Sequence, residues 1–129
     1  MPAKLQTLCS RVEVEQLKAK LKLHELHVVQ QNLQAVSYRT RATSHARISD
    51  SHWLISQRYK LKLETDPEGA LHLHYELKVR YHLLQAEQHR EHFTHYRWLA
   101  IEYEKKAEAH EMLCDYLQHK VAKRQPVEE

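Results

Sequence analysis

The scarcity of glycine constrains this chain more than any other feature of its sequence. It has a single glycine, Gly69, among 129 residues, and its prolines stand only at positions 2, 67 and 126. Average usage would give about nine glycines and six prolines. Tight β-turns, bulges and phosphate-binding loops rely on glycine because it adopts positive φ without strain. The sequence therefore excludes a many-turned β-sandwich and contains neither a Rossmann nor a P-loop fingerprint.

The composition favours amphipathic helices. Hydrophobic residues make up 42% and charged residues 29% of the chain, and the mean hydropathy is −0.75. No apolar run approaches the roughly 18 residues of a membrane span, and the N-terminal residues lack the apolar core of a signal peptide. Two cysteines, Cys9 and Cys114, suit a reducing compartment. We therefore expect a cytoplasmic protein, with association with the cytoskeleton and a nuclear location both left open.

Helix-breaking residues cluster at one internal place, Thr65-Asp66-Pro67-Glu68-Gly69. Asp66 is a good N-cap and Pro67 a good first helical residue, so the sequence predicts one helical unit over 1–129, with arms over about 3–64 and 67–124 joined at 65–69. A short connection between arms of similar length predicts an antiparallel hairpin in which the numbers of facing residues add up to about 132. The segment 37–51 is rich in serine and threonine, so a break there is the alternative to a continuous first arm.

The second arm carries the clearest pattern. Fifteen successive positions at alternating steps of three and four, from His72 to Val121, contain no Asp, Glu, Lys or Arg. A period of 3.5 residues held for seven heptads predicts a coiled-coil seam. The candidate interaction seam consists of Tyr75, Val79, His82, His89, Phe93, Tyr96, Tyr103, His110, Leu117 and Val121.

Apolar residues also lie outside this seam, which predicts that further helices complete the core. On the second arm the second apolar face consists of Leu73, Leu77, Leu84, Trp98 and Ile101. On the first arm one heptad phase holds Leu5, Leu8, Val12, Ala19, Leu26, Val29, Leu33 and Val36, with Glu15 and Lys22 as polar interruptions, and a second phase holds Leu17, Leu21, His24 and Val28.

Histidine is unusually frequent, at twelve residues, so a metal site has to be considered. No two histidines stand four residues apart, which is the spacing that two metal ligands on one helical face prefer. We therefore predict no metal site and no cofactor. Histidines in the seam, at 72, 82, 89 and 110, are expected to set the register of the helices, as polar seam residues do in coiled coils. A pH sensor is the alternative reading.

Charge is divided unevenly between the arms. Residues 1–63 hold eleven Lys or Arg and four acidic residues, whereas residues 64–129 hold nine and thirteen. A candidate basic patch consists of Arg39, Arg41, Arg47, Arg58, Lys60 and Lys62. It could bind an acidic surface, such as a microtubule, an acidic subunit or, less favoured, nucleic acid. The ordinary alternative is a solvated face that the acidic second arm partly balances.

The pattern as a whole predicts an all-α protein, an elongated antiparallel helical hairpin or coiled coil that partner helices complete. We expect a non-enzymatic structural or scaffold subunit of a larger assembly, cytoskeletal or microtubule-associated, that binds other coiled-coil chains or itself and no membrane. A basic helical module that binds nucleic acid through residues 39–62 is the alternative. A catalytic site is not expected, because adjacent Ser, His and Asp residues on one helix do not form a triad.

Overall fold

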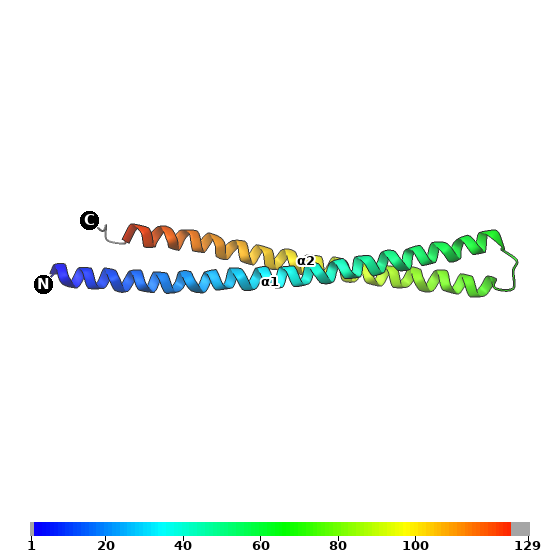
Figure 1. The fold of residues 1–129 in the computed structure, drawn as a ribbon, viewed down its shortest axis with the longest axis horizontal. Coiled ribbons are helices and arrows are strands. Elements are labelled where there is room, and N and C mark those ends of the chain that lie inside the picture. The colour runs from blue at the N-terminus through cyan, green and yellow to red at the C-terminus, as the bar shows by residue number, and fades with distance from the viewer. Residues whose placement is uncertain (1, 125–129) are drawn as a thin grey trace. The chain divides into compact units, whose positions relative to one another are not determined.

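The computed structural model describes the backbone of residues 2–124 and the side chains of residues 10–124. Two helices account for nearly all of it: α1 spans Pro2–Thr65 and α2 spans His72–Arg124. They pack against each other in opposite directions, as Figure 1 shows, so the predicted antiparallel helical hairpin is confirmed. Over the described residues, neither helix has a stretch that is apolar enough for its length to cross a lipid bilayer.

Helix α1 continues through residues 37–51 without interruption. No glycine or proline occurs between residues 3 and 66, and the hydroxyls of Thr40, Thr43 and Ser51 donate to carbonyl oxygens four residues earlier, at 2.9–3.0 Å. These hydrogen bonds keep the polar hydroxyls within the helix instead of ending it. The serine and threonine content is therefore compatible with an unbroken helix.

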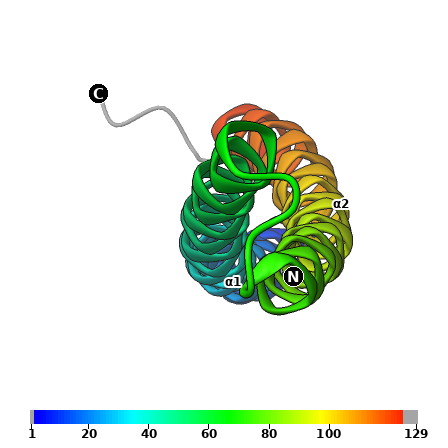
Figure 2. The same cartoon turned by 90° about the vertical axis from the view of Figure 1, so that its right-hand side faces the viewer.

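The connection occupies residues 66–71, and Figure 2 shows it joining the two helix ends. Helix α2 begins at His72, five residues later than the position expected from Pro67. The backbone N–H of Gly69 donates to Asp66 O at 3.3 Å, and that of His72 donates to Gly69 O at 3.1 Å, so two turns precede the helix. A Cβ at position 69 would meet the carboxylate of Asp66. Gly69 has no positive φ, and the Asp66 side chain is exposed and can turn away, so this position does not require glycine.

The chain divides into two compact units. The terminal unit comprises Met1–Ala35 and Ile101–Glu129, and the turn unit comprises Val36–Ala100. In the terminal unit the core is apolar: Val14, Leu17, Leu117 and Val121 are buried together, and Leu21 packs against them. Burial of such side chains is the main favourable contribution to folding. In the turn unit the buried side chains are small instead, namely Ala42, Ser49, Ser56, Ala86 and Ala100.

The two heptad phases of α1 have opposite surroundings. The phase of Leu17, Leu21 and Val28 is buried or half-buried and faces α2. The longer phase lies on the other side of the helix: Val12, Leu26, Val29, Leu33 and Val36 are 53–65% exposed. This phase also contains Glu15 and Lys22, and a charged side chain is costly to bury in a seam. The number of apolar residues alone thus points to the wrong face of α1 as the seam.

Candidate functional site

The predicted seam of α2 lies against α1. Within the terminal unit Leu117 and Val121 are buried, and Tyr103 and His110 are half-buried. In the turn unit the seam residues are half-buried: Tyr75, Val79, His82, His89, Phe93 and Tyr96. His72 departs from this pattern because it is exposed and lies 3.7 Å from the carboxylate of Glu76.

The turn unit contains a ladder of identical ring pairs that we call the aromatic ladder. On α1 its members stand seven residues apart, at Tyr38, His45, His52 and Tyr59, and on α2 they do so at Tyr75, His82, His89 and Tyr96. Each ring faces its own kind: Tyr38 with Tyr96, His45 with His89, His52 with His82 and Tyr59 with Tyr75, with ring centroids 5.1–6.0 Å apart. The facing numbers add up to 134, so the register lies two residues from the predicted 132. The connection, which extends to residue 71, accommodates this register.

Histidines in the ladder are joined directly. The Nδ1 atoms of His45 and His89 lie 2.8 Å apart, as do those of His52 and His82. At this distance one Nδ1 carries a proton and donates it to the lone pair of the other. Each neutral pair therefore combines two different tautomers, and the bond fixes the orientation of both rings.

Between the histidine pairs, small residues let the helices approach closely. Ser49 is 2% exposed, and its hydroxyl donates to the backbone oxygen of Ala86 on α2 at 2.7 Å. The hydroxyl of Ser56, which is fully buried, donates to Trp53 O at 2.6 Å. A larger side chain at either position would compete for space with the rings of the ladder.

Cations cover the tyrosine ends of the ladder. The guanidinium of Arg41 lies 5.5 Å from the centre of the Tyr38 ring and 5.9 Å from that of Tyr96. Lys62 Nζ lies 5.3 Å from the ring centres of both Tyr59 and Tyr75. These are cation–π distances. Two members of the predicted basic patch thus have a structural role beside the seam.

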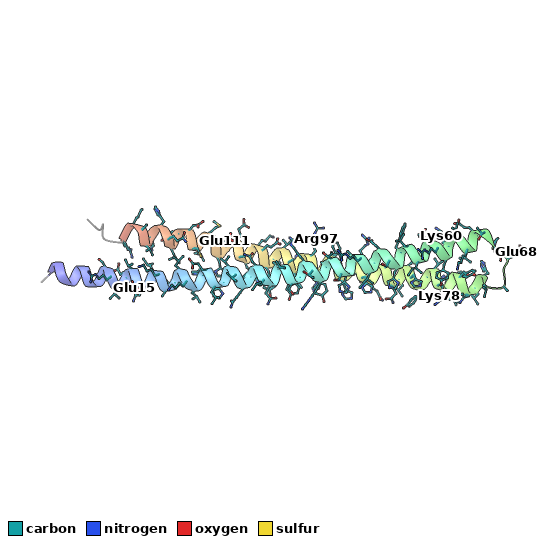
Figure 3. The ribbon with its side chains drawn as sticks, viewed as in Figure 1. Glu15, Lys60, Glu68, Lys78, Arg97 and Glu111 are labelled. Carbon is teal, nitrogen blue, oxygen red and sulfur yellow. The ribbon has the colours of Figure 1, made fainter. Side chains whose placement is uncertain are left out.

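The other members of the basic patch do not gather on one face. Arg39, Arg47, Arg58 and Lys60 are all exposed, but with 3.6 residues per turn they point in several directions around α1. Lys60 is marked in Figure 3 near the connection. The structure therefore spreads these charges around a helix instead of concentrating them on a single surface.

The terminal unit repeats the histidine arrangement once. His24 Nδ1 lies 2.9 Å from His110 Nδ1, and the ring of His27 stacks on His110 with centroids 4.9 Å apart. In the turn unit, His92 stacks on His45 at the same distance. Each of these clusters thus joins two histidines spaced by three on one helix to one histidine on the other. Among the described residues, however, no group of three or more His, Cys, Asp or Glu side chains is placed to hold a metal ion.

One histidine of each pair resists protonation. Burial, together with the neighbouring imidazoles His89 and His92, lowers the pKa of His45. Burial also lowers the pKa of His82, with contributions from His52 and Lys78. In the same way, burial and the imidazoles of its own cluster lower the pKa of His110. A second positive charge beside the first is unfavourable in each pair.

The cysteines can be assessed only in part. Cys114 is buried in the terminal unit with a free thiol, and burial, followed by the nearby carboxylates Glu25, Asp115 and Glu111, raises the pKa of that thiol. A thiol of raised pKa is a poor nucleophile at neutral pH. Cys9 lies outside the residues whose side chains are described.

Exposed apolar rows form the second candidate site. On α1 the outer row of the terminal unit consists of Val12, Leu26, Val29 and Leu33, with Glu15 and Lys22 in the same phase. Figure 3 marks Glu15 on the side of α1 that is turned away from α2. On α2 the predicted second apolar face is exposed at Leu73, Leu77, Leu84 and Trp98, and Ile101 is half-exposed.

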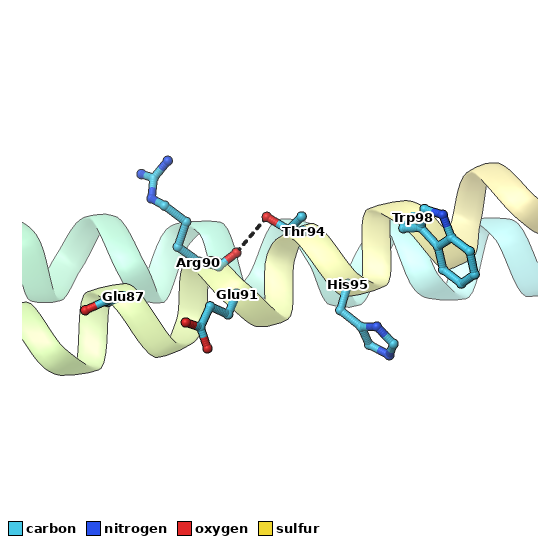
Figure 4. A pocket seen from close by; sticks show the side chains of 6 residues that line it. All are labelled: Glu87, Arg90, Glu91, Thr94, His95 and Trp98. Carbon is cyan, nitrogen blue, oxygen red and sulfur yellow. Dashed lines mark hydrogen bonds between the residues drawn. The ribbon is translucent and has the colours of Figure 1, made fainter.

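A shallow hollow beside Trp98 is lined by a single helix. Its residues are Glu87, Arg90, Glu91, Thr94, His95 and Trp98, all from α2 (Figure 4). The Thr94 hydroxyl donates to Arg90 O at 3.0 Å, within the helix. The hollow is therefore an open helix face rather than an enclosed cavity of the kind that holds a small molecule.

Sequence reasoning missed the α1 half of the ladder. Tyr38 and His45 lie in the serine- and threonine-rich segment, where apolar anchors are few. Their signal is the seven-residue spacing of Tyr38, His45, His52 and Tyr59, which mirrors the spacing on α2. Comparison of the chain with protein-family models, with curated proteins and with solved structures found no match.

Proposed function

We propose that the protein is a non-enzymatic coiled-coil subunit whose outer row on α1 binds an amphipathic helix of a different chain. One observation carries the proposal: five of the seven positions in the heptad row from Val12 to Leu33 are apolar, yet its large side chains are 53–65% exposed. Apolar residues at alternating steps of three and four form a coiled-coil seam when a partner helix covers them. Contiguous exposed rows of this kind are typical of interaction surfaces.

The charges within the outer row favour a different chain over a second copy. In a parallel pair of α1 helices, Glu15 would face Glu15 and Lys22 would face Lys22. In an antiparallel pair that places Leu26 opposite Val29, Lys22 would instead face Leu33. Like charges and unpaired charges in a seam both cost free energy. The expected partner helix therefore has leucine, isoleucine or valine at its seam positions and an acidic residue where it meets Lys22.

The remaining surface supports a scaffold role. The hollows beside Trp98 and beside Val12 are each lined by one helix and are open to solvent. Membership of a cytoskeletal or microtubule-associated assembly stays a prediction. The nucleic-acid alternative has less support, since Arg41 and Lys62 lie over tyrosine rings and the other basic residues point in different directions.

Matched leucine variants test the proposal. Leu33 and Leu61 both lie on α1 and are 65% and 61% exposed, but only Leu33 belongs to the outer row of the terminal unit. Partners are first identified by affinity purification with crosslinking mass spectrometry and are then purified. We expect Leu33→Ser to weaken binding about tenfold or more, because buried leucines contribute ~1.5–3 kcal/mol, and Leu61→Ser to leave it unchanged. Both variants should keep the circular dichroism of the parent protein.

Three outcomes would overturn the proposal. One is a purified partner whose crosslinks avoid Lys18, Lys20 and Lys22 and whose binding tolerates Leu33→Ser. Another is self-association through the outer row, seen as a dimer in sedimentation that Leu33→Ser dissolves. The third is binding to DNA or RNA that falls steeply with salt and is lost when Arg47 and Arg58 are replaced by glutamine.

A further inference from the structure

The histidine pairs of the aromatic ladder are arranged so that their protonation affects the contacts between α1 and α2. In each pair the two Nδ1 atoms lie 2.8 Å apart and share one proton. A pair that gains one proton can bind it at Nε2 of the donor ring, so that a single N–H still lies between the two Nδ1 atoms and the hydrogen bond is kept. A pair that gains two protons places two N–H groups and two positive charges against each other. The hydrogen bond is then lost and the charges repel.

The groups around the pairs do not offset added positive charge. His45 faces His89, His92 and Tyr96 of α2, and His89 in turn lies beside His52 of α1. The carboxylate of Asp50 lies 3.8 Å from Arg90 and is 71% exposed.

The surroundings of the second pair, His52 with His82, are of the same kind. His82 faces His52 and Tyr59 of α1, and it has Tyr81 and Lys78 beside it on its own helix. The ring of His52 also meets the edge of Tyr81. Imidazoles, phenols and an ammonium thus surround both histidine pairs.

The terminal unit offers an internal contrast. Its core cluster of Val14, Leu17, Leu21, Leu117 and Val121 contains no group that titrates. It has one histidine pair, His24 with His110, whereas the turn unit has two in successive heptads. Acid therefore removes a larger share of the interhelical contacts in the turn unit.

We propose that the turn unit is an acid-sensitive section of the hairpin, in which α1 and α2 separate between about pH 6.5 and 5 while the apolar cluster of the terminal unit stays packed. The trigger is double protonation of the pairs His45–His89 and His52–His82. The consequence is a local opening of residues 42–56 from residues 79–93. The inference concerns the fold and does not depend on the partner helix proposed above.

The direction of the effect follows from proton binding. The folded state holds the pKa of His45 and of His82 below the ordinary histidine value, so the unfolded or opened state binds more protons. Stability is then complete well above the ordinary value of about 6.5 and is lost as the pH falls through and below it. A histidine with a raised pKa would give the opposite sign.

Hydrogen exchange of the full chain at pH 7.5 and pH 5.0, corrected for the intrinsic dependence of exchange on pH, tests the local opening. We expect amide protection in 42–56 and 79–93 to fall about tenfold or more, because the opened state binds more protons than the folded one. In 14–21 and 114–121 we expect a change of less than about threefold. Equal loss in both units, or none in the turn unit, would contradict the proposal.

Variants separate the histidine pairs from general effects of acid. The double variant His52→Leu with His82→Leu removes one titrating pair, and the addition of His45→Leu with His89→Leu removes both. Leucine is an ordinary seam residue, and the double variant keeps the test valid if the fourfold variant misfolds. We expect the fall in Tm between pH 7.5 and 5.0, about 5–10 °C in the parent protein, to shrink by about half in the double variant and largely to vanish in the fourfold one.

Matched controls use exposed histidines. His95 and His119 are both exposed on α2, so His95→Gln with His119→Gln should retain the full pH dependence. If this control removes the dependence and the seam variants keep it, the proposal fails. Measurements are repeated with EDTA and with added Zn²⁺. A dependence on pH that disappears in EDTA would identify loss of a bound metal, rather than double protonation, as the cause and would overturn the inference.

Discussion

The two units of the hairpin use the same heptad spacing with different chemistry. In the terminal unit, Leu17 and Leu117 pack with Val14 and Val121 in an apolar cluster. In the turn unit the equivalent positions hold histidine and tyrosine pairs, separated by alanine and serine. The apolar cluster stabilises the packing of the two helices because its side chains are removed from water, and this effect has no preferred direction. The ladder adds directional bonds that match like with like, so it specifies the register and titrates with pH.

This difference assigns separate tasks to the two units. A shift of the ladder by one heptad would place histidine opposite tyrosine at its ends and leave one histidine pair where there are now two. A shift of the apolar cluster would exchange one aliphatic contact for another, and in the terminal unit only the pair of His24 with His110 would oppose it. Polar seam residues in coiled coils are known to trade stability for a unique register. We therefore expect the following substitutions to affect stability most where the core is apolar.

The largest effect is expected at Leu117, which is 7% exposed in the apolar cluster. Leu117→Ala should lower the free energy of unfolding by about 2–4 kcal/mol, because it removes buried methyl groups and leaves a cavity. Urea denaturation followed by circular dichroism measures the change. Leu113 is 44% exposed on the same helix, and Leu113→Ala should cost less than about 0.5 kcal/mol. Equal losses for the two variants would contradict the apolar cluster.

The second-largest loss of stability is expected from a larger side chain in the packed seam of the turn unit. Ala86 is 7% exposed and its backbone oxygen accepts from Ser49. Ala86→Leu should cost about 1–3 kcal/mol, since the rings of His82 and His89 leave no room for three more carbon atoms. A stabilised variant would mean that the helices can move apart and that the small residues do not fix their separation. Thermal melting is the measurement.

A smaller loss is expected at Ser49. Ser49→Ala removes the 2.7 Å hydrogen bond to Ala86 O while it keeps nearly the same volume. The cost should be about 1 kcal/mol, the usual net contribution of such a bond. Ser44→Ala, at an exposed position of α1, is the control. A neutral or stabilising result for Ser49→Ala would show that the hydroxyl is dispensable in the seam.

The smallest effect is expected at the ion pair between Asp50 and Arg90. The two side chains are 71% and 69% exposed and lie 3.8 Å apart. Asp50→Asn should change stability by less than about 0.5 kcal/mol, because exposed pairs gain little in water and are screened by salt. The difference should disappear at about 1 M salt, where the screening length is ~3 Å. A larger loss that persists at high salt would indicate a second role for Asp50.

Patterns in single segments predicted much of α2 and less of α1. The fifteen uncharged positions from His72 to Val121 indicate which face of α2 is covered, because a charged side chain would be costly there. On α1 the number of apolar residues points to the row of Val12, Leu26 and Leu33, which is exposed. The absence of charge points to the other row, because Glu15 and Lys22 interrupt the exposed one and no charged residue interrupts the phase of Leu17, Leu21 and Val28.

The connection shows that contacts between the helices can override a local capping preference. Asp66 and Pro67 are suitable as the start of a helix, yet the backbone forms two turns and α2 begins at His72. Local capping preferences are worth about 1 kcal/mol, and the matching of four ring pairs along the ladder outweighs them. The register therefore follows the interhelical contacts and not the favoured cap.

By itself the sequence determined the all-helical class, the single reversal of the chain and the uncharged face of α2, because glycine content, proline position and heptad spacing act locally. Only the tertiary structure decided the pairing of His45 with His89 and of His52 with His82, and the exposure of the outer row. These properties depend on which side chains meet across two helices. Hydrogen bonds and ring contacts between residues 30–58 positions apart cannot be read from the periodicity of either helix alone.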